Sequence, residues 1–128
     1  MKVGAGCLAG LCAALLAVPA LAHHSFAMFD SRTVMILDGT VRGFIWTNPH
    51  SWIRISVSDA AGRQLDWMIE MSSSSEIARR GWSPMTIKPG DRVTIAAHPA
   101  KHEPKMAQYV AVKLPDGTTL TENPNFKL

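Results

Sequence analysis

The side chains best suited to chemistry in this 128-residue chain are its five histidines. They fall in three separate segments, at positions His23, His24, His50, His98 and His102. Imidazole nitrogens suit Cu(II), Ni(II) and Zn(II), and copper comes first among these in the Irving–Williams order. No HxH, HExxH or CxxC motif accompanies them, so the histidines predict metal-binding capacity without defining a known type of site.

The first 22 residues have the features of a secretory signal peptide. Lys2 provides a positive start, an uncharged run rich in Ala, Leu and Gly follows, and Ala20-Leu21-Ala22 matches the small-x-small pattern of a cleavage site. The apolar run falls short of the roughly 20 residues that span a bilayer. We therefore expect a cleaved leader over 1–22, no stable membrane span afterwards, and a periplasmic or secreted bacterial protein.

Removal of the leader would change what the first histidines can do. Cleavage at its end makes His23 the first residue, whose α-amine and ring nitrogen together form a bidentate chelate for copper. A third nitrogen from His50 or His98 would complete an arrangement that resembles a histidine brace. Cleavage after Leu21 would instead place His24 third and create an amino-terminal copper and nickel chelate. The competing interpretation is that His23 and His24 belong to a solvated N-terminal segment of the mature chain. The other histidines would then stabilise turns and strand ends, and none would bind a metal.

Cysteine usage limits how the domain can be stabilised, and its net charge limits the kinds of partner that it can have. Cys7 and Cys12 both lie in the predicted leader, so the mature domain must be held together by its core without disulfides. Thirteen basic and ten acidic side chains give a net charge of +3, and removal of Lys2 lowers it to +2. This charge is ordinary for a small soluble domain, and an exported protein meets little nucleic acid, so no nucleic-acid partner is predicted.

A second group of candidate functional side chains lies in residues 40–58. Alternating apolar residues on both sides of Asn48-Pro49 predict two antiparallel strands joined by a turn. The predicted inward positions are Val41, Ile45, Ile53, Ile55 and Val57. The predicted outward positions are Arg42, Phe44, Trp46, Trp52 and Arg54. An exposed aromatic and basic surface of this kind predicts binding of a protein, peptide or glycan partner.

The remaining periodicities predict an all-β fold. Strands are expected over 33–46, 51–58, 64–71, 92–98 and 107–114, followed by a short last strand and a loose tail. Ser73 and Glu76 form a capping box, and Gly81 ends a helix of about two turns before Trp82 folds back. One helix between the third and fourth strands is typical of the OB-fold. We predict a five- to six-stranded OB-fold-like barrel over 23–128, with another small barrel or roll as the alternative.

The predicted topology places two loops that carry histidines next to each other. The loop that holds His50 and the loop that follows His98 and holds His102 would flank one binding face. In the fifth strand, Val110 and Val112 are expected to point inward. The third strand carries Asp66 and Glu70 on its outer face, where solvated carboxylates are the common case.

Several short motifs spread over nearly the whole mature chain. They are His23-His24-Ser25-Phe26, Gly39-Thr40-Val41, Trp46-Thr47-Asn48-Pro49-His50-Ser51-Trp52, Gly81-Trp82, Lys88-Pro89-Gly90-Asp91 and His98-Pro99-Ala100-Lys101. With them the chain resembles a family of small secreted bacterial proteins of unknown function. The resemblance implies that these segments belong together in one structural and functional unit. It implies no established activity.

Two functional hypotheses follow from the sequence. The first is an exported barrel that binds a metal ion, with copper preferred, through the N-terminal and loop histidines. The alternative is a module without metal that holds an envelope partner on the aromatic and basic surface. No nucleophile elbow, phosphate loop or dinucleotide fingerprint occurs, so the sequence points to a binding protein more than to an enzyme.

Overall fold

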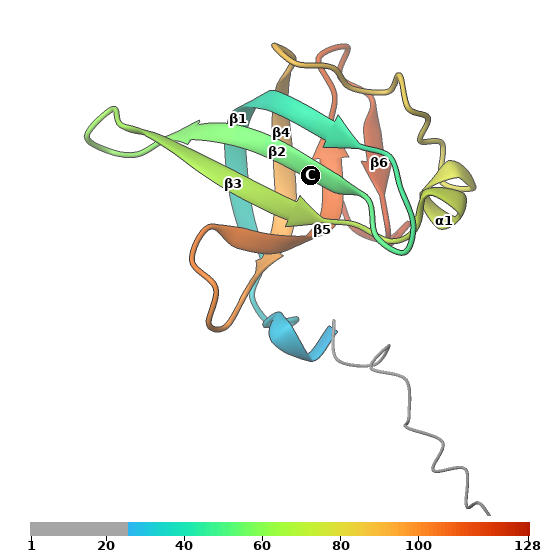
Figure 1. Cartoon of the computed structure of the whole chain (residues 1–128), viewed down its shortest axis with the longest axis horizontal. Coiled ribbons are helices and arrows are strands. Elements are labelled where there is room, and N and C mark those ends of the chain that lie inside the picture. Colours follow the sequence, from blue (N-terminus) through green and yellow to red (C-terminus); the bar gives the residue numbers. More distant parts are fainter. Residues whose placement is uncertain (1–25) are drawn as a thin grey trace, which may run out of the picture.

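The fold of this chain is a small barrel of β-strands. A computed structural model describes residues 26–128, so the predicted leader and both N-terminal histidines lie outside the described part. The elements in chain order are η2 (Phe26–Met28), β1 (Met35–Ile45), β2 (Trp52–Ser58), β3 (Gln64–Glu70), α1 (Ser74–Ala78), β4 (Arg92–Pro99), β5 (Met106–Lys113) and β6 (Thr119–Thr121). Figure 1 shows the strands wrapped around a common interior, with α1 at one end.

Pairing between strands confirms the predicted OB-fold-like topology. The sheet order is β3-β2-β1-β4-β5-β6, and an additional pairing joins β3 to β5. This last pairing is parallel, whereas the other five are antiparallel, and it closes the first five strands into a barrel. The sixth strand extends the sheet beside the C-terminal half of β5. The short helix lies between β3 and β4, as the sequence predicted.

The interior is filled by inward side chains from all five barrel strands. Fully buried members include Val41, Ile53, Ile55, Ile69, Ile95 and Val112. Side chains from the segment between β3 and β4 complete this core at one end, with Met71, Ile77, Trp82 and Ile87 all buried. Burial of apolar surface on this scale is the main stabilising term in a domain without disulfides.

The ends of α1 follow the predicted capping chemistry. The Ser73 hydroxyl accepts a hydrogen bond from the Glu76 backbone N–H at 3.3 Å, which caps the first turn. Gly81 has a φ of +92°, and the Trp82 N–H then donates to the Ile77 carbonyl at 3.1 Å. The helix is shorter than expected, with five residues; it places Ile77 in the core, and the turn that follows it places Trp82 there.

A β-bulge in β1 overturns part of the predicted facing. The register with β2 shifts between Val41 and Gly43, so that Phe44 pairs opposite the buried Ile53. One extra residue reverses the side of every later position. Phe44 and Trp46 therefore pack against the core, and the side chain of Ile45 is the exposed one, with 44% of its surface accessible.

A second bulge changes the facing in β5. The register with β4 shifts between Ala96 and Ala97, which places Tyr109 inside the barrel. Val112 points inward as predicted, but Val110 does not. Val110 belongs to a small outer cluster with Ala96 and Ala111, against which the C-terminal residues Phe126 and Leu128 pack. The tail that was expected to be loose thus covers part of the barrel's outer surface.

Gly39 marks the point where β1 pairs with β2 and β4 at once, opposite Val57 and Val93. A Cβ at this position would lie 2.8 Å from the Ser56 carbonyl oxygen, a backbone atom that cannot move aside easily. We expect Gly39→Ala to destabilise the barrel by about 1–3 kcal/mol, the usual cost of overpacking.

Gly43→Ala is the matched control, because its Cβ would meet nothing nearer than the flexible Arg54 side chain at 3.9 Å. Its effect should stay within about 0.5 kcal/mol. Urea denaturation of both variants measures the difference, and equal stabilities would contradict the assigned close approach.

Candidate functional site

Three of the five predicted histidine ligands lie in the described part of the chain. His50 follows the turn between β1 and β2, His98 lies near the end of β4, and His102 lies in the loop between β4 and β5. His23 and His24 fall outside the described residues. The structure therefore shows how the three loop and strand histidines relate to one another.

The ring of His50 is held in one orientation by its neighbours. Its Nδ1 lies 2.9 Å from Glu70 Oε1 and 3.3 Å from the Met71 carbonyl oxygen. Both partners accept hydrogen bonds, so Nδ1 carries the proton and Nε2 is left as the acceptor in the neutral ring. Glu70 was expected to be a solvated strand carboxylate, but only 6% of its surface is accessible. It acts instead as a buried positioning partner for His50.

His98 is held in a similar way by backbone. Its Nδ1 donates to the Thr33 carbonyl oxygen at 2.7 Å, because a carbonyl can only accept. In the neutral ring, Nε2 is again the nitrogen with a free lone pair. Metal-binding histidines commonly have one nitrogen fixed in this manner, but so do histidines with a purely structural role.

Strand register separates His50 from His98. Glu70, which holds His50, pairs with Gln108 of β5, and Gln108 pairs with His98 of β4. Two strand spacings of about 4.8 Å each thus lie between Glu70 and His98. Within residues 26–128, no three side chains of the His, Cys, Asp or Glu type are grouped closely enough to hold a metal ion. The described part of the chain does not by itself assemble the predicted metal site.

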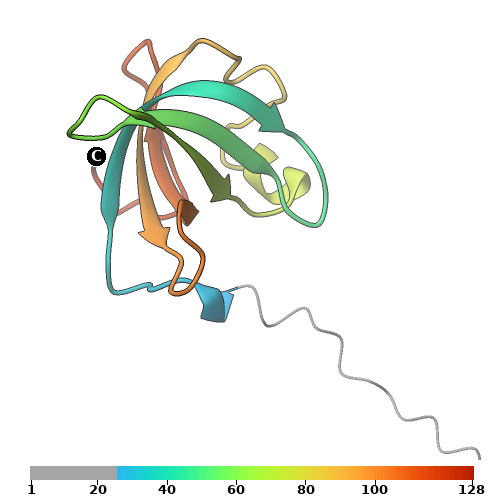
Figure 2. The ribbon, with the colours of Figure 1, turned by 60° about the vertical axis from the view of Figure 1, so that its left-hand side comes forward.

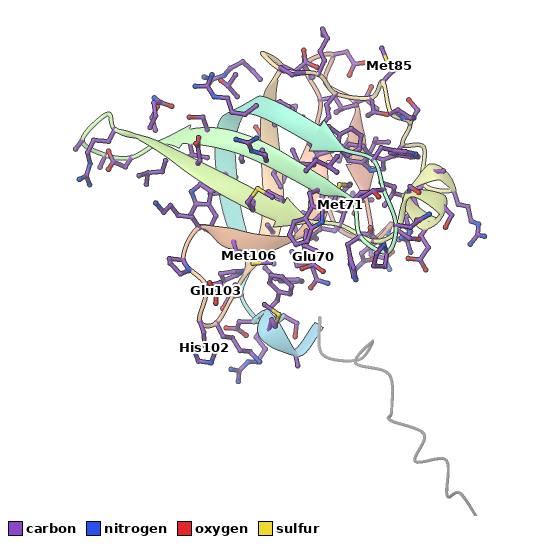
Figure 3. The ribbon with its side chains drawn as sticks, viewed as in Figure 1. Glu70, Met71, Met85, His102, Glu103 and Met106 are labelled. Carbon is purple, nitrogen blue, oxygen red and sulfur yellow. The ribbon has the colours of Figure 1, made fainter. Side chains whose placement is uncertain are left out.

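His102 lies in a different setting, beside the N-terminal segment. It lines a small, mostly apolar hollow of about 170 Å³ together with Met28, Ala100 and Glu103. Figures 1 and 2 both show the β4–β5 loop next to η2, and Figure 3 shows His102 and Glu103 on that loop. Its imidazole is exposed, and no hydrogen bond to it occurs among residues 26–128.

The predicted aromatic and basic surface is only partly present. Phe44 contacts both Trp46 and Trp82, with ring centroids 5.8 and 5.4 Å apart; Trp82 belongs to the core, and the half-buried Phe44 and Trp46 pack against it. Arg42 and Arg54 are exposed, and Trp52 is half-buried on the outer side of β2. The β1 bulge brings Ile45 to this side, opposite Trp52. The outer face of the hairpin therefore consists of Arg42, Ile45, Trp52 and Arg54.

A cleft lined by Glu70, Gln108 and His98 was not predicted from the sequence. Its volume is about 470 Å³, and it lies where the ends of β3 and β4, the middle of β5 and the segment after β6 meet. Glu122 and Phe126 line it from the C-terminal segment, whose last residues the sequence predicted to be a loose tail. The available signal was Glu70, a carboxylate whose strand position precedes a buried Met71 and follows a buried Ile69.

A family model described as a "Family of unknown function (DUF6152)" matches residues 11–108. The chain belongs to this family. The matched stretch includes all five histidines and the outer face of the hairpin, whereas β6 and the segment after it lie beyond the match. Membership in DUF6152 establishes the family and assigns no activity. No curated protein matches the chain.

Two solved structures resemble this member of DUF6152. Both are of Rim1, the mitochondrial single-stranded DNA binding protein of S. cerevisiae, at 14% and 15% sequence identity. Each comparison covers 64% of this chain and 92% of the other, with TM-scores of 0.48 and 0.44. Among residues 26–128, no helix has the length and hydropathy that crossing a membrane requires.

The β1 bulge makes a prediction about two neighbouring residues. Phe44→Ala should cost at least about 2 kcal/mol, a little less than loss of a fully buried aromatic ring, because Phe44 is half-buried and packs against Trp82. Ile45→Ala should cost less than about 1 kcal/mol, because that side chain lies on the surface. Thermal and urea unfolding of the two variants measure the two stability losses. A larger loss for Ile45→Ala than for Phe44→Ala would contradict the bulge and favour the uninterrupted alternation predicted from the sequence.

Proposed function

We propose that this protein is an exported copper-binding barrel whose site combines His23 of the processed N-terminus with His102. The observation that carries the proposal is the attachment of the segment after the histidines to the β4–β5 loop. Phe29 forms a β-bridge with Ala100 and is buried. The chain before it is therefore tied to the same loop that presents His102.

Several hydrogen bonds hold this segment in place. The Lys101 backbone N–H donates to the Met28 carbonyl at 2.8 Å, and its Nζ donates to the Ala27 carbonyl at 2.9 Å. The Asp30 N–H also donates to the Pro99 carbonyl at 2.9 Å. Four peptide units between the α-carbons of His23 and Ala27 span at most about 14 Å. This reach includes the surroundings of His102, two residues beyond Ala100.

The donor set suits Cu(II). The α-amine and imidazole of an N-terminal His23 supply two nitrogens, and the exposed ring of His102 can supply a third. Glu103 lines the same hollow and offers a carboxylate oxygen. His50 and His98, the third ligands expected from sequence, each have Nδ1 engaged, by Glu70 and by the Thr33 carbonyl. The proposed site uses His102 as its third ligand instead, because the ring of His102 is exposed on the loop that the N-terminal segment contacts.

Copper titration tests the proposal. Protein processed after Ala22 should bind one Cu(II) with sub-micromolar affinity, about −8 kcal/mol or better. One extra N-terminal Met should abolish this binding, since the amine is displaced, and His102→Ala should weaken it at least tenfold. His98→Ala is the matched control and should bind as the parent does. Loss on adding Met without any effect of His102→Ala would indicate a chelate made by the N-terminus alone.

A second candidate function is supported by the outer face of the hairpin, defined above as Arg42, Ile45, Trp52 and Arg54. A surface-exposed isoleucine beside a tryptophan and two arginines has the composition of a recognition surface. OB-fold barrels bind ligands over their second and third strands, and two of the four residues, Trp52 and Arg54, lie on β2. The partner would be an envelope protein, a peptide or a glycan.

Capture experiments with the tagged protein test this face. Trp52→Ala and Arg54→Ala should each reduce recovery of a partner from envelope extracts at least fivefold, with no change in unfolding temperature large enough to explain it. Met85→Ala provides the control, because Met85 is highly exposed but lies in the segment between α1 and β4 (Figure 3). Equal loss with Met85→Ala, or no loss with Trp52→Ala, would rule out this surface.

A further inference from the structure

The cleft of about 470 Å³ has the volume of a small-molecule site. It is lined by residues of β3, β4 and β5, which run side by side, and by the segments before β1 and after β6. Figure 3 shows two of the lining residues, Glu70 and Met71, at the end of β3. Among the described residues, none lines both this cleft and the hollow that contains His102. The cleft is therefore a second, separate place for a ligand.

The two carboxylates of the cleft are already paired. Glu70 Oε1 lies 2.9 Å from Nδ1 of His50. One carboxylate oxygen of Glu122 contacts Arg80, and the other is buried, out of reach of a ligand. No lysine or arginine is among the described residues that line the cleft. A cationic ligand would thus find its carboxylates engaged, and an anionic ligand would find no basic side chain. The lining favours a neutral molecule.

Two neighbouring side chains supply hydrogen-bonding groups that a neutral molecule can use. Gln108 of β5 pairs with His98 of β4 in an antiparallel ladder, so their side chains lie side by side on one face. Both residues are half-buried, and the side-chain amide of Gln108 makes no hydrogen bond to any of the described residues. Nδ1 of His98 donates to the Thr33 carbonyl, which leaves Nε2 of the neutral ring as an acceptor.

These groups match adjacent hydroxyls on a ring. A hydroxyl both donates and accepts, so the Gln108 amide can donate to one hydroxyl and accept from its neighbour through the carbonyl oxygen. A third hydroxyl can donate to Nε2 of His98. The hydroxyls of Ser31 and Ser72 line the same cleft and add further polar groups. A simple alcohol cannot satisfy the amide and the imidazole together, whereas a polyhydroxylated ring can.

Much of the remaining wall is apolar. Val34 from the segment before β1 and Phe126 from the C-terminal tail line the cleft, along with Met71 and Val110. Val34 keeps 42% of its surface accessible, and the half-buried Phe126 packs against Val110. The C–H side of a sugar ring would cover this surface and gain stabilisation from the buried area. An apolar lining with a few placed polar groups is the usual composition of a small-molecule site.

We propose that this cleft binds a neutral sugar, with adjacent hydroxyls on the Gln108 amide, a third hydroxyl on Nε2 of His98, and the C–H side of the ring against Phe126 and Val34. The sugar is a free monosaccharide or the end of a longer glycan, which present the same hydroxyls. Among the described residues, the cleft shares none with the outer face of the hairpin or with the hollow beside His102. Sugar binding is therefore independent of both functions proposed above.

Titrations followed by two-dimensional 15N–1H spectra test the cleft, because the side-chain amide of Gln108 has its own signals. The metal-free protein is kept in a chelator, and the probes are glucose, galactose, N-acetylglucosamine, maltose, lactose and chitobiose. At least one of them should shift the Gln108 amide and bind with a Kd below about 10 mM. Tighter binding of a disaccharide than of its monosaccharide identifies a glycan end as the source, and equal affinity identifies the free sugar.

Two comparison compounds test the chemistry of recognition. Cyclohexanol has a ring of similar size with a single hydroxyl and should bind at least tenfold more weakly than the best sugar. Glucuronate adds a carboxylate and should bind no more tightly than glucose, because no lysine or arginine is among the described residues lining the cleft. Cyclohexanol binding as tightly as the best sugar, tighter binding of glucuronate, or a Gln108 amide that no sugar shifts would overturn the proposal.

Matched variants locate the bound sugar. Gln108→Met keeps the side-chain length but removes the amide, and it should weaken binding at least tenfold. Gln64→Met makes the same change at the other end of β3, outside the cleft, and should alter the Kd less than twofold. If Gln108→Met proves unstable, Val34→Asp removes exposed apolar surface from the cleft and should weaken binding at least fivefold. Ile36→Asp is its control, since Ile36 is also exposed but does not line the cleft. Unchanged binding in the cleft variants would contradict the site.

Discussion

The structure depends on the parallel pairing of β3 with β5. Only three residue pairs form this contact, which joins Met68, Ile69 and Glu70 to Met106, Ala107 and Gln108. Without it the strands would form an open sheet with two long unpaired edges, and the apolar face would be incompletely covered. With it, Ile69 and Ala107 meet inside a closed core. The same three pairs place Glu70 beside Gln108 in the strand register, although Glu70 itself is buried.

Closure also explains where the functional candidates lie. The loops at the ends of β1 and β4 approach the closing strands, so His50 reaches Glu70 and His98 lies one strand beyond Gln108. Each of these histidines has one nitrogen engaged by a fixed acceptor, Glu70 or the Thr33 carbonyl. Their orientations therefore come from the barrel itself. His102, in contrast, is presented by a loop that the N-terminal segment supports.

Two bulges decide which side chains are surface and which are core. The bulge in β1 moves Phe44 and Trp46 inward and exposes Ile45, and the bulge between β4 and β5 exchanges Tyr109 for Val110. Burial raises the pKa of the Tyr109 phenol, whose hydroxyl donates to the Leu120 carbonyl at 2.8 Å. Tyr109 thereby joins the core to β6, next to the C-terminal segment that lines the cleft.

Sequence alone determined the element order, the capped helix and the OB-fold-like topology. These features depend on local signals, such as the Ser73 cap, the left-handed Gly81 and the alternation of apolar residues within each strand. Only the tertiary structure decided the facing beyond each bulge, since an inserted residue reverses the alternation without a local mark. It also decided the burial of Glu70 and the position of Glu122. Their surroundings come from strands distant in sequence, which pair only when the barrel closes.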